Sequence, residues 1–254
     1  MPRGLTDILS ELNRLLEPER FRDYCPNGLQ VPGRTEIETV ATGVSAHAEL
    51  FELARAEQAD LLVVHHGLFW NSDSGALDIV CKQRLQLLFQ ADISLAAYHL
   101  PLDAHPQLGN NAQLARRLGA TELERFAMHH GEPIGFIGQF PDEGITPTEL
   151  LTRVQELTDR EPLMFEYGPA VIRRLAIVSG AGSDYLSQAI DAGAEAFLTG
   201  EPAERVMAHA REAGVHFLAA GHYATETLGV QALGEHLASH FGLRHVYLDV
   251  PNPI

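Results

Sequence analysis

The chain has few cysteines, no long apolar run and little positive charge, and each shortage excludes a class of protein. Its 254 residues include two cysteines, Cys25 and Cys81, too few for a disulfide framework or a thiolate zinc cluster. No apolar stretch approaches the roughly 20 residues that cross a bilayer, so we expect no membrane association. Such a chain suits a reducing compartment, and we expect it in the cytoplasm.

Basic residues are scarce as well. Eighteen lysines and arginines stand against 34 aspartates and glutamates, a formal net charge of −16. This balance argues against a DNA or RNA partner, because nucleic-acid binders neutralise phosphates with basic patches. A single nucleotide remains compatible, since a bound metal ion can locally outweigh nearby carboxylates. The sequence also has neither a nucleophile elbow nor a phosphate-binding P-loop.

Apolar, strand-like segments alternate with helical patterns, and this alternation predicts an α/β fold. An amphipathic helix is expected first, at residues 6–16. Strands are then expected at 39–44, 61–64, 93–97, 174–178, 196–199 and 215–220, with helices at 46–56, 77–90, 184–192 and 202–213.

The second half of this pattern repeats the first. Residues 40–66 match residues 175–201 without a gap, and residues 95–99 match residues 218–222. Hydrophobic patterning alone makes α/β units resemble one another, but the polar matches favour a duplication. The sequence therefore predicts a first α/β repeat over 1–124 and a second over 171–254, packed against the first.

The segment between the repeats, 125–170, has a different pattern and is expected to form a smaller α+β insert. It contains a strand-like stretch at 134–140 and a turn at 141–144. A helix should begin after Thr146, which can cap its first turn with Pro147 in the first helical position and Glu149 completing a capping box.

Two adjacent histidines, His65 and His66, end an apolar run and precede Gly67. A buried imidazole needs partners for both ring nitrogens, and neutral imidazole is the commonest metal-binding side chain. Taken alone, this dipeptide fits a solvated strand end as well as it fits a metal site.

A histidine followed four positions later by a carboxylate occurs in each repeat. His99 precedes Asp103, and its counterpart in the match, His222, precedes Glu226. Asp103 could instead cap a helix, and Glu226 could favour a helix N-terminus through the dipole. Each pair alone is weak support for a site.

Taken together, these side chains lie at predicted carboxyl ends of strands, where open α/β sheets bind ligands. Five protein ligands exceed the three of a catalytic zinc site but suit two bridged ions. The mixed nitrogen and oxygen donors fit zinc, iron or manganese. The expected ligands of two divalent ions per subunit are His65, His66, Asp103, His222 and Glu226.

The whole chain closely resembles the GTP cyclohydrolase 1 type 2 homologues, also called NIF-three-like dinuclear metal-centre proteins. The motifs that carry this resemblance are PNGLQV at 26–31, VHHGLFW at 64–70, HLPLDA at 99–104, GNN at 109–111, TGE at 199–201, GHYATE at 221–226 and the terminal PNP at 251–253. The resemblance implies paired metals on the five residues above, two intertwined α/β repeats with mixed sheets, and a toroidal homohexamer. One departure, Cys25-Pro26 where many relatives carry Trp-Asp, lies outside that ligand set.

Further polar residues near the expected centre have more than one role open to them. The family pattern places His99 behind Asp103, where it could orient a ligand or transfer a proton. Glu201 aligns with His66 and could face the cavity, or it could favour the start of the next helix. Tyr98 and Tyr223 flank the two histidines and could donate protons, but a tyrosine beside a strand end is more often a packing residue with a satisfied hydroxyl.

Two functions fit these expectations. In the first, a hydroxide that bridges the two ions attacks a small-molecule substrate, which makes the protein a metal-dependent hydrolase. A nucleotide is one candidate substrate, suggested by the family name and not by any residue. In the second, the ions are cargo or structural, and the protein is a non-enzymatic scaffold, adaptor or metal-handling protein.

Overall fold

The computed structural model describes residues 2–73, 75–141 and 143–254, and it divides into two units that alternate along the chain. Unit 1 contains residues 1–102 and 229–250, and unit 2 contains residues 103–228 and 251–254. Strands from the expected insert, 125–170, belong to the sheet of unit 2. No helix among the described residues is long and apolar enough to cross a membrane.

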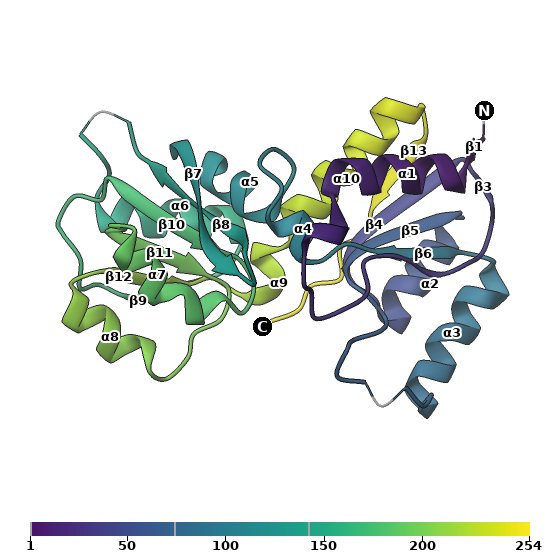
Figure 1. Ribbon diagram of the computed structural model, residues 1–254, viewed down its shortest axis with the longest axis horizontal. Helices are drawn as coiled ribbons and strands as arrows, with labels where there is room; N and C mark the ends of the chain where they lie inside the picture. The colour runs from purple at the N-terminus through teal and green to yellow at the C-terminus, as the bar shows by residue number, and fades with distance from the viewer. Residues whose placement is uncertain (1, 74, 142) are drawn as a thin grey trace. The chain divides into compact units, whose positions relative to one another are not determined.

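Unit 1 is built on a mixed five-stranded sheet with helices on both faces (Figure 1). The sheet order is β13 (Arg244–Tyr247), β4 (Thr39–Ser45), β5 (Leu61–His66), β6 (Ser94–Ala97) and β2 (Gly28–Val31), with only β2 antiparallel to its neighbour. One face carries α1 (Leu5–Leu16) and α10 (Thr227–Phe241), and the other α2 (Ala48–Ala56) and α3 (Ile79–Ala91). The smaller elements are β1 (Arg3–Gly4), β3 (Glu36–Ile37), η1 (Pro18–Arg20) and α4 (Leu100–Asp103), whose last residue belongs to unit 2.

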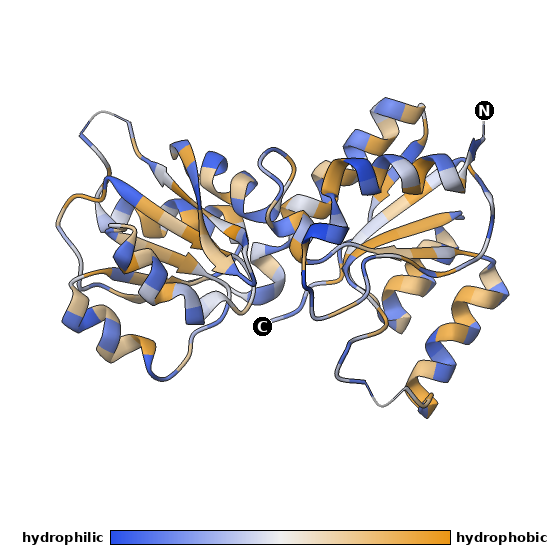
Figure 2. Cartoon of the chain, viewed as in Figure 1, coloured by the Kyte–Doolittle hydropathy of each residue, from blue (hydrophilic) through white to orange (hydrophobic). Residues whose placement is uncertain are grey.

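The central strands of this sheet are apolar on both faces because helices cover both faces. Every residue from Leu61 to Val64 is 0 % exposed. Figure 2 shows these strands as hydrophobic ribbons between helices of mixed polarity. The core of unit 1 packs Leu50, Phe51 and Leu88 of α2 and α3 against them.

Unit 2 has a mixed six-stranded sheet that includes the predicted insert. Its order is β7 (Thr121–His129), β8 (Glu132–Gln139), β10 (Arg174–Val178), β11 (Ala196–Thr199), β12 (His216–Ala219) and β9 (Leu163–Phe165), with β10, β11 and β12 parallel. Its helices are α5 (Asn110–Arg117), α6 (Pro147–Thr158), η2 (Gly182–Tyr185), α7 (Leu186–Asp191), α8 (Val206–Ala213) and α9 (His222–Thr225). The mixed α/β fold of both units is the predicted fold class.

The last helices of the two sequence repeats are exchanged between the units. Helix α5 follows the first repeat's strands, yet Leu114 and Ala115 belong to the core of unit 2. In return, most of α10 and all of β13 lie in unit 1, where β13 pairs with β4. The two repeats are therefore intertwined, as the resemblance implied.

The strand ladders confirm one part of the repeat match and correct another. Val40 pairs with Leu61 and Leu175 with Ala196, in agreement with the match of residues 40–66 to 175–201. The third strand differs, because Ser94 pairs with Leu61 whereas His216 pairs with Ala196, one position short of the sequence match. In this register the structural counterpart of His99 is Gly221, and His222 instead opens α9.

Local differences from the sequence expectations have identifiable causes. Helix α8 begins at Val206 and not at residue 202, since a turn at residues 204–205 precedes it. The expected helix at 184–192 is divided into η2 and α7. Thr146 caps α6 as predicted by accepting from Glu149 N at 3.2 Å, but the Glu149 carboxylate pairs with Arg153. Asp142 of the expected turn lies outside the described residues.

Candidate metal centre

His65 lies at the carboxyl end of β5 and is 0 % exposed. Its Nδ1 lies 3.1 Å from the carbonyl oxygen of Tyr98. Because a carbonyl oxygen only accepts, Nδ1 carries the proton and Nε2 keeps its lone pair. His65 is thereby held in the tautomer and ring orientation of a metal ligand that coordinates through Nε2.

His66 follows at the half-buried end of the strand. It pairs with Ser45 of β4, whose Oγ lies 3.0 Å from His66 Nδ1. The rings of His65 and His66 lie 4.6 Å apart at 45°. The two imidazoles are therefore neighbours at one strand end, although successive strand residues usually point to opposite faces.

His99 is the third imidazole of this group, and Asp23 fixes its ring. His99 Nδ1 donates to Asp23 Oδ1 at 2.6 Å. Burial alone would raise the pKa of Asp23, but the hydrogen bond and charge of His99 outweigh it and hold that pKa below its ordinary value. The His99 ring lies 4.9 Å from that of His65 and 5.5 Å from that of His66. This arrangement leaves His99 Nε2 directed away from the carboxylate, as proton transfer would require.

The segment that holds His99 is the Pro26-Asn27-Gly28 motif and the aspartate before it. Asn27 Oδ1 accepts from the His99 amide at 2.8 Å, and Asn27 Nδ2 donates to Asp23 Oδ2 at 2.8 Å. The sequence reasoning missed Asp23, because the residue lies in a loop with no periodic pattern. No spacing in the sequence marks it, because its role depends on a contact with His99 that forms only on folding.

In unit 2, a buried hydrogen-bond network positions Asp103, which is 6 % exposed. Asp103 Oδ1 accepts from Asn110 Nδ2 at 2.9 Å and from Ser179 Oγ at 3.1 Å. Asn111 supports the same network by accepting from Ser179 N at 2.7 Å. The N-cap of α5 is Gly109, so Asp103 does not have the capping role that remained open from sequence.

His222 lies between two carboxylates. Its Nδ1 bonds to Glu201 Oε1, and its Nε2 lies 3.2 Å from Oε2 of Glu226, which is 2 % exposed. Burial disfavours a charged imidazole, but the carboxylates of Glu226 and Glu201 outweigh it and raise the pKa of His222 to about 9. Glu201 therefore contacts His222 and orients its ring.

Two glycines make room for this group. A Cβ at Gly180 would overlap the Glu226 carboxylate, and the residue has φ +61°. A Cβ at Gly200 would lie 2.7 Å from His222 Cα. The amides of Gly180 and Gly182 donate to the hydroxyls of Thr225 and Thr199, both at 3.0 Å, so these two amides hold the turn after β10 in place.

The donor sets of both units fit divalent transition metals. In unit 1, ligand atoms of His65, His66 and His99 lie within 4.8 Å of one another. In unit 2, ligand atoms of Glu226 lie within 4.8 Å of those of Asp103 and of His222. Imidazole nitrogens and carboxylate oxygens suit zinc, iron or manganese, and second contacts to the His and Asp ligands are typical of metal sites.

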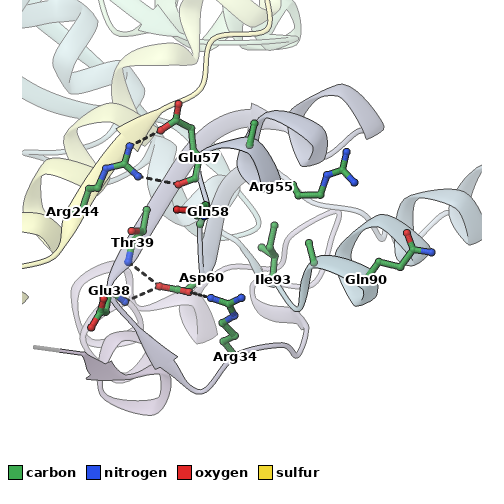
Figure 3. A pocket seen from close by; sticks show the side chains of 13 residues that line it. Arg34, Glu38, Thr39, Arg55, Glu57, Gln58, Asp60, Gln90, Ile93 and Arg244 are labelled. Carbon is green, nitrogen blue, oxygen red and sulfur yellow. Dashed lines mark hydrogen bonds and ion pairs between the residues drawn. The ribbon is translucent and has the colours of Figure 1, made fainter.

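Two further groups of unit 1 have structural roles. The Tyr98 hydroxyl donates to Asn13 Oδ1 at 2.8 Å, and burial raises the pKa of Tyr98, so it is a packing residue. A pocket of about 820 Å³ lies in unit 1 at the opposite, amino ends of the strands (Figure 3). Its Asp60 accepts from the Glu38 and Thr39 amides and from Arg34, so this carboxylate holds the chain in place at the start of β4.

Comparisons with known proteins cover the whole chain. A family model described as Duf34/NIF3 (NGG1p interacting factor 3) matches residues 4–253. A Pseudomonas aeruginosa protein named GTP cyclohydrolase 1 type 2 homolog is 44 % identical over 100 % of both chains, and a Vibrio cholerae protein of that name is 42 % identical over 96 % of both. The TTHA1606 structure from Thermus thermophilus is 37 % identical with a TM-score of 0.90, covering 99 % of this chain and 100 % of its own.

Proposed function

Because the chain belongs to the Duf34/NIF3 family, we propose that it binds two divalent metal ions and hydrolyses a small-molecule substrate. The observation that carries this proposal is that other groups of the protein hold two of the expected ligands in position. His65 has its Nδ1 proton committed to a carbonyl, and Asp103 is held by an amide and a hydroxyl. Second hydrogen bonds of this kind to histidine and carboxylate ligands are typical of metal sites.

The proposed ligands come from both units. Unit 1 supplies His65 and His66, and unit 2 supplies Asp103, His222 and Glu226. Zinc, iron and manganese all match these donors, and two such ions would polarise a substrate and lower the pKa of a bound water.

The remaining polar residues of the two groups assist the ligands. His99 Nε2 accepts a proton from the attacking water, while its Nδ1–H stays hydrogen bonded to Asp23. Glu201 orients His222 through Nδ1, which directs Nε2 toward the neighbourhood of Glu226. Asp23 and Glu201 are thus positioning residues. The names of the bacterial relatives make a purine nucleotide, opened by hydrolysis of its base, the first substrate to test.

Self-association into the toroidal homohexamer that the resemblance implies is part of this proposal. Large apolar side chains are exposed on and just before α3, with Leu77 63 %, Ile79 65 % and Phe89 60 % exposed. Burial of such side chains favours association. Light scattering should give six times the chain mass of 27.8 kDa, and a monomer would contradict this part.

The family description, NGG1p interacting factor 3, supports a second function, because an interacting factor acts through a protein partner. In that case the ions would be structural or cargo, and no substrate would be consumed. The metal-loaded protein can be screened against GTP, cyclic amides, peptides and phosphoesters, with a chelated sample in parallel. Turnover that the chelator abolishes supports the hydrolase, whereas complete inertness with readily exchanged metal supports the adaptor.

Metal content tests the site independently of any substrate. Asp103→Asn and Glu226→Gln should each lose at least one of the two ions per chain, measured by elemental analysis after gel filtration. Asp191→Asn is a matched control, because Asp191 is an exposed carboxylate of the same unit. Full metal content in both site variants would refute the ligand assignment.

A further inference from the structure

A second group of metal-ligating side chains lies in unit 1 and shares no residue with the proposed centre. It joins two helices that cover the same face of the sheet (Figure 1). Glu11 comes from α1, while His236 and His240 come from successive turns of α10. Residues four apart on a helix lie on one face, so both imidazoles are available to the same ion.

The distances within this group are close to those that a metal ion requires. His236 Nε2 lies 2.9 Å from Glu11 Oε1, and the His236 and His240 rings lie 5.6 Å apart at 23°. One ligand atom from each of the three residues lies within 4.8 Å of the others. Ligands bonded at about 2.0–2.1 Å around a tetrahedral ion lie roughly 3.3 Å apart, so modest side-chain rotations would complete the geometry.

Arg14 orients the carboxylate of this group. Arg14 donates to Glu11 through both Nε and Nη2, each at 2.8 Å. This fork fixes the Glu11 plane while the Arg14 side chain remains 67 % exposed, so solvent screens its charge. Glu11 is 8 % exposed, whereas His240 is exposed, so an ion can reach the group from solvent.

We propose that Glu11, His236 and His240 form a surface site for one divalent late transition-metal ion, such as zinc, nickel or copper, with water in the remaining positions. A site with two imidazoles and one carboxylate favours these ions over magnesium and calcium, which prefer oxygen ligands alone. A bound ion would link α1 to α10, since it bonds to both helices. The site is independent of the proposed hydrolase function.

Zinc binding to the full chain tests this site. Equilibrium dialysis should show one equivalent fewer for His240→Ala and His236→Gln than for the unaltered protein, or at least a tenfold weaker affinity for that equivalent. The glutamine side chain introduced by His236→Gln has an amide that can donate to Glu11, so this variant should preserve the helix contact. His209→Ala is the control, because His209 is an exposed histidine on α8 and should leave zinc content unchanged.

Hydrogen exchange locates the bound ion. Zinc should slow exchange in α1 and α10 of the unaltered protein, and His240→Ala should remove that protection. Equal zinc content in the parent, His240→Ala and His236→Gln would overturn the proposal. That result would leave the Asp103 and Glu226 measurements unaffected, so failure of this site and failure of the proposed function are distinguishable.

Discussion

The Asp23 carboxylate and the His99 ring form a 2.6 Å hydrogen bond across 76 positions of sequence. Asp23 Oδ1 also accepts from the Tyr24 amide at 2.6 Å, while Oδ2 accepts from Asn27 Nδ2 and from the Leu100 amide. The Asp23 side chain is 3 % exposed, and each of its oxygens thus accepts from two donors. This loop residue connects the start of unit 1 to the segment that carries His99.

We therefore expect that an isosteric amide cannot replace Asp23. In Asp23→Asn, the NH₂ group must face two donors, so unfolding free energy should fall by about 2–4 kcal/mol. Denaturant unfolding measures this loss. Asp191→Asn, at an exposed position, should change stability by less than about 0.5 kcal/mol. Equal stability of the two variants would refute the role given to Asp23.

Gly180→Ala should weaken metal binding by about 10–100-fold, because its methyl group would displace the Glu226 carboxylate. Gly193→Ala is a matched control, since Gly193 has a comparable φ of +76° but no described atom within 4 Å of an added Cβ. Both variants incur similar backbone strain of roughly 1 kcal/mol. Metal titration should therefore separate the two variants, whereas the shared backbone strain should lower the melting temperature of both. Equal metal affinities would show that the glycine does not serve the carboxylate.

His245 should make the protein less stable under mildly acidic conditions. Burial lowers its pKa in the folded state, and its Nε2 lies 2.8 Å from Thr42 Oγ1. A lowered folded pKa means that the neutral form favours folding. This contribution is present above the unfolded value of about 6.5 and is lost as pH falls toward the folded pKa. His245→Gln should flatten the stability profile below pH 6.5, whereas His209→Gln should leave its slope unchanged.

The cap of α6 should contribute measurable stability. Thr146 Oγ1 accepts from the Glu149 amide at 3.2 Å, and Thr146→Ala leaves that donor without its side-chain acceptor. We expect a loss of about 1 kcal/mol in unfolding free energy. Thr148→Ala, within the first turn of the same helix, should cost nothing or stabilise slightly, because alanine favours helix. A loss of the same size in Thr148→Ala would point to a general effect on α6.

The sequence predicts the central strands well because their physical signal is local. Leu61–His66 is an apolar run closed by two histidines, since helices cover both faces of the strand and its end is polar. The partner of His99 is not local, because Asp23 becomes relevant only through a contact formed by folding. The equivalence of His99 and His222 was wrong by one position, since identical letters were matched where the ladder of β11 and β12 sets the register.

The placement of α5 and α10 shows a further limit. Their periodicity predicts which side of each helix is apolar, but it does not specify which sheet that side covers. Leu114 packs in unit 2, and the part of α10 from Gly229 onward belongs to unit 1. The expectation that the repeats are intertwined came from the family resemblance, and hydrophobic patterning alone could not supply it.

The reciprocal placement of α5 and α10 also affects the order in which the chain can fold during synthesis. Unit 2 has almost all of its residues once the ribosome has passed Leu228. Unit 1 starts earlier but lacks an edge of its sheet until β13 at Arg244–Tyr247 emerges and pairs with β4. The strands of unit 1 that are synthesised first therefore keep that sheet edge unpaired until residues near the end of the chain emerge. The unit that begins synthesis first is consequently the later of the two to complete its sheet.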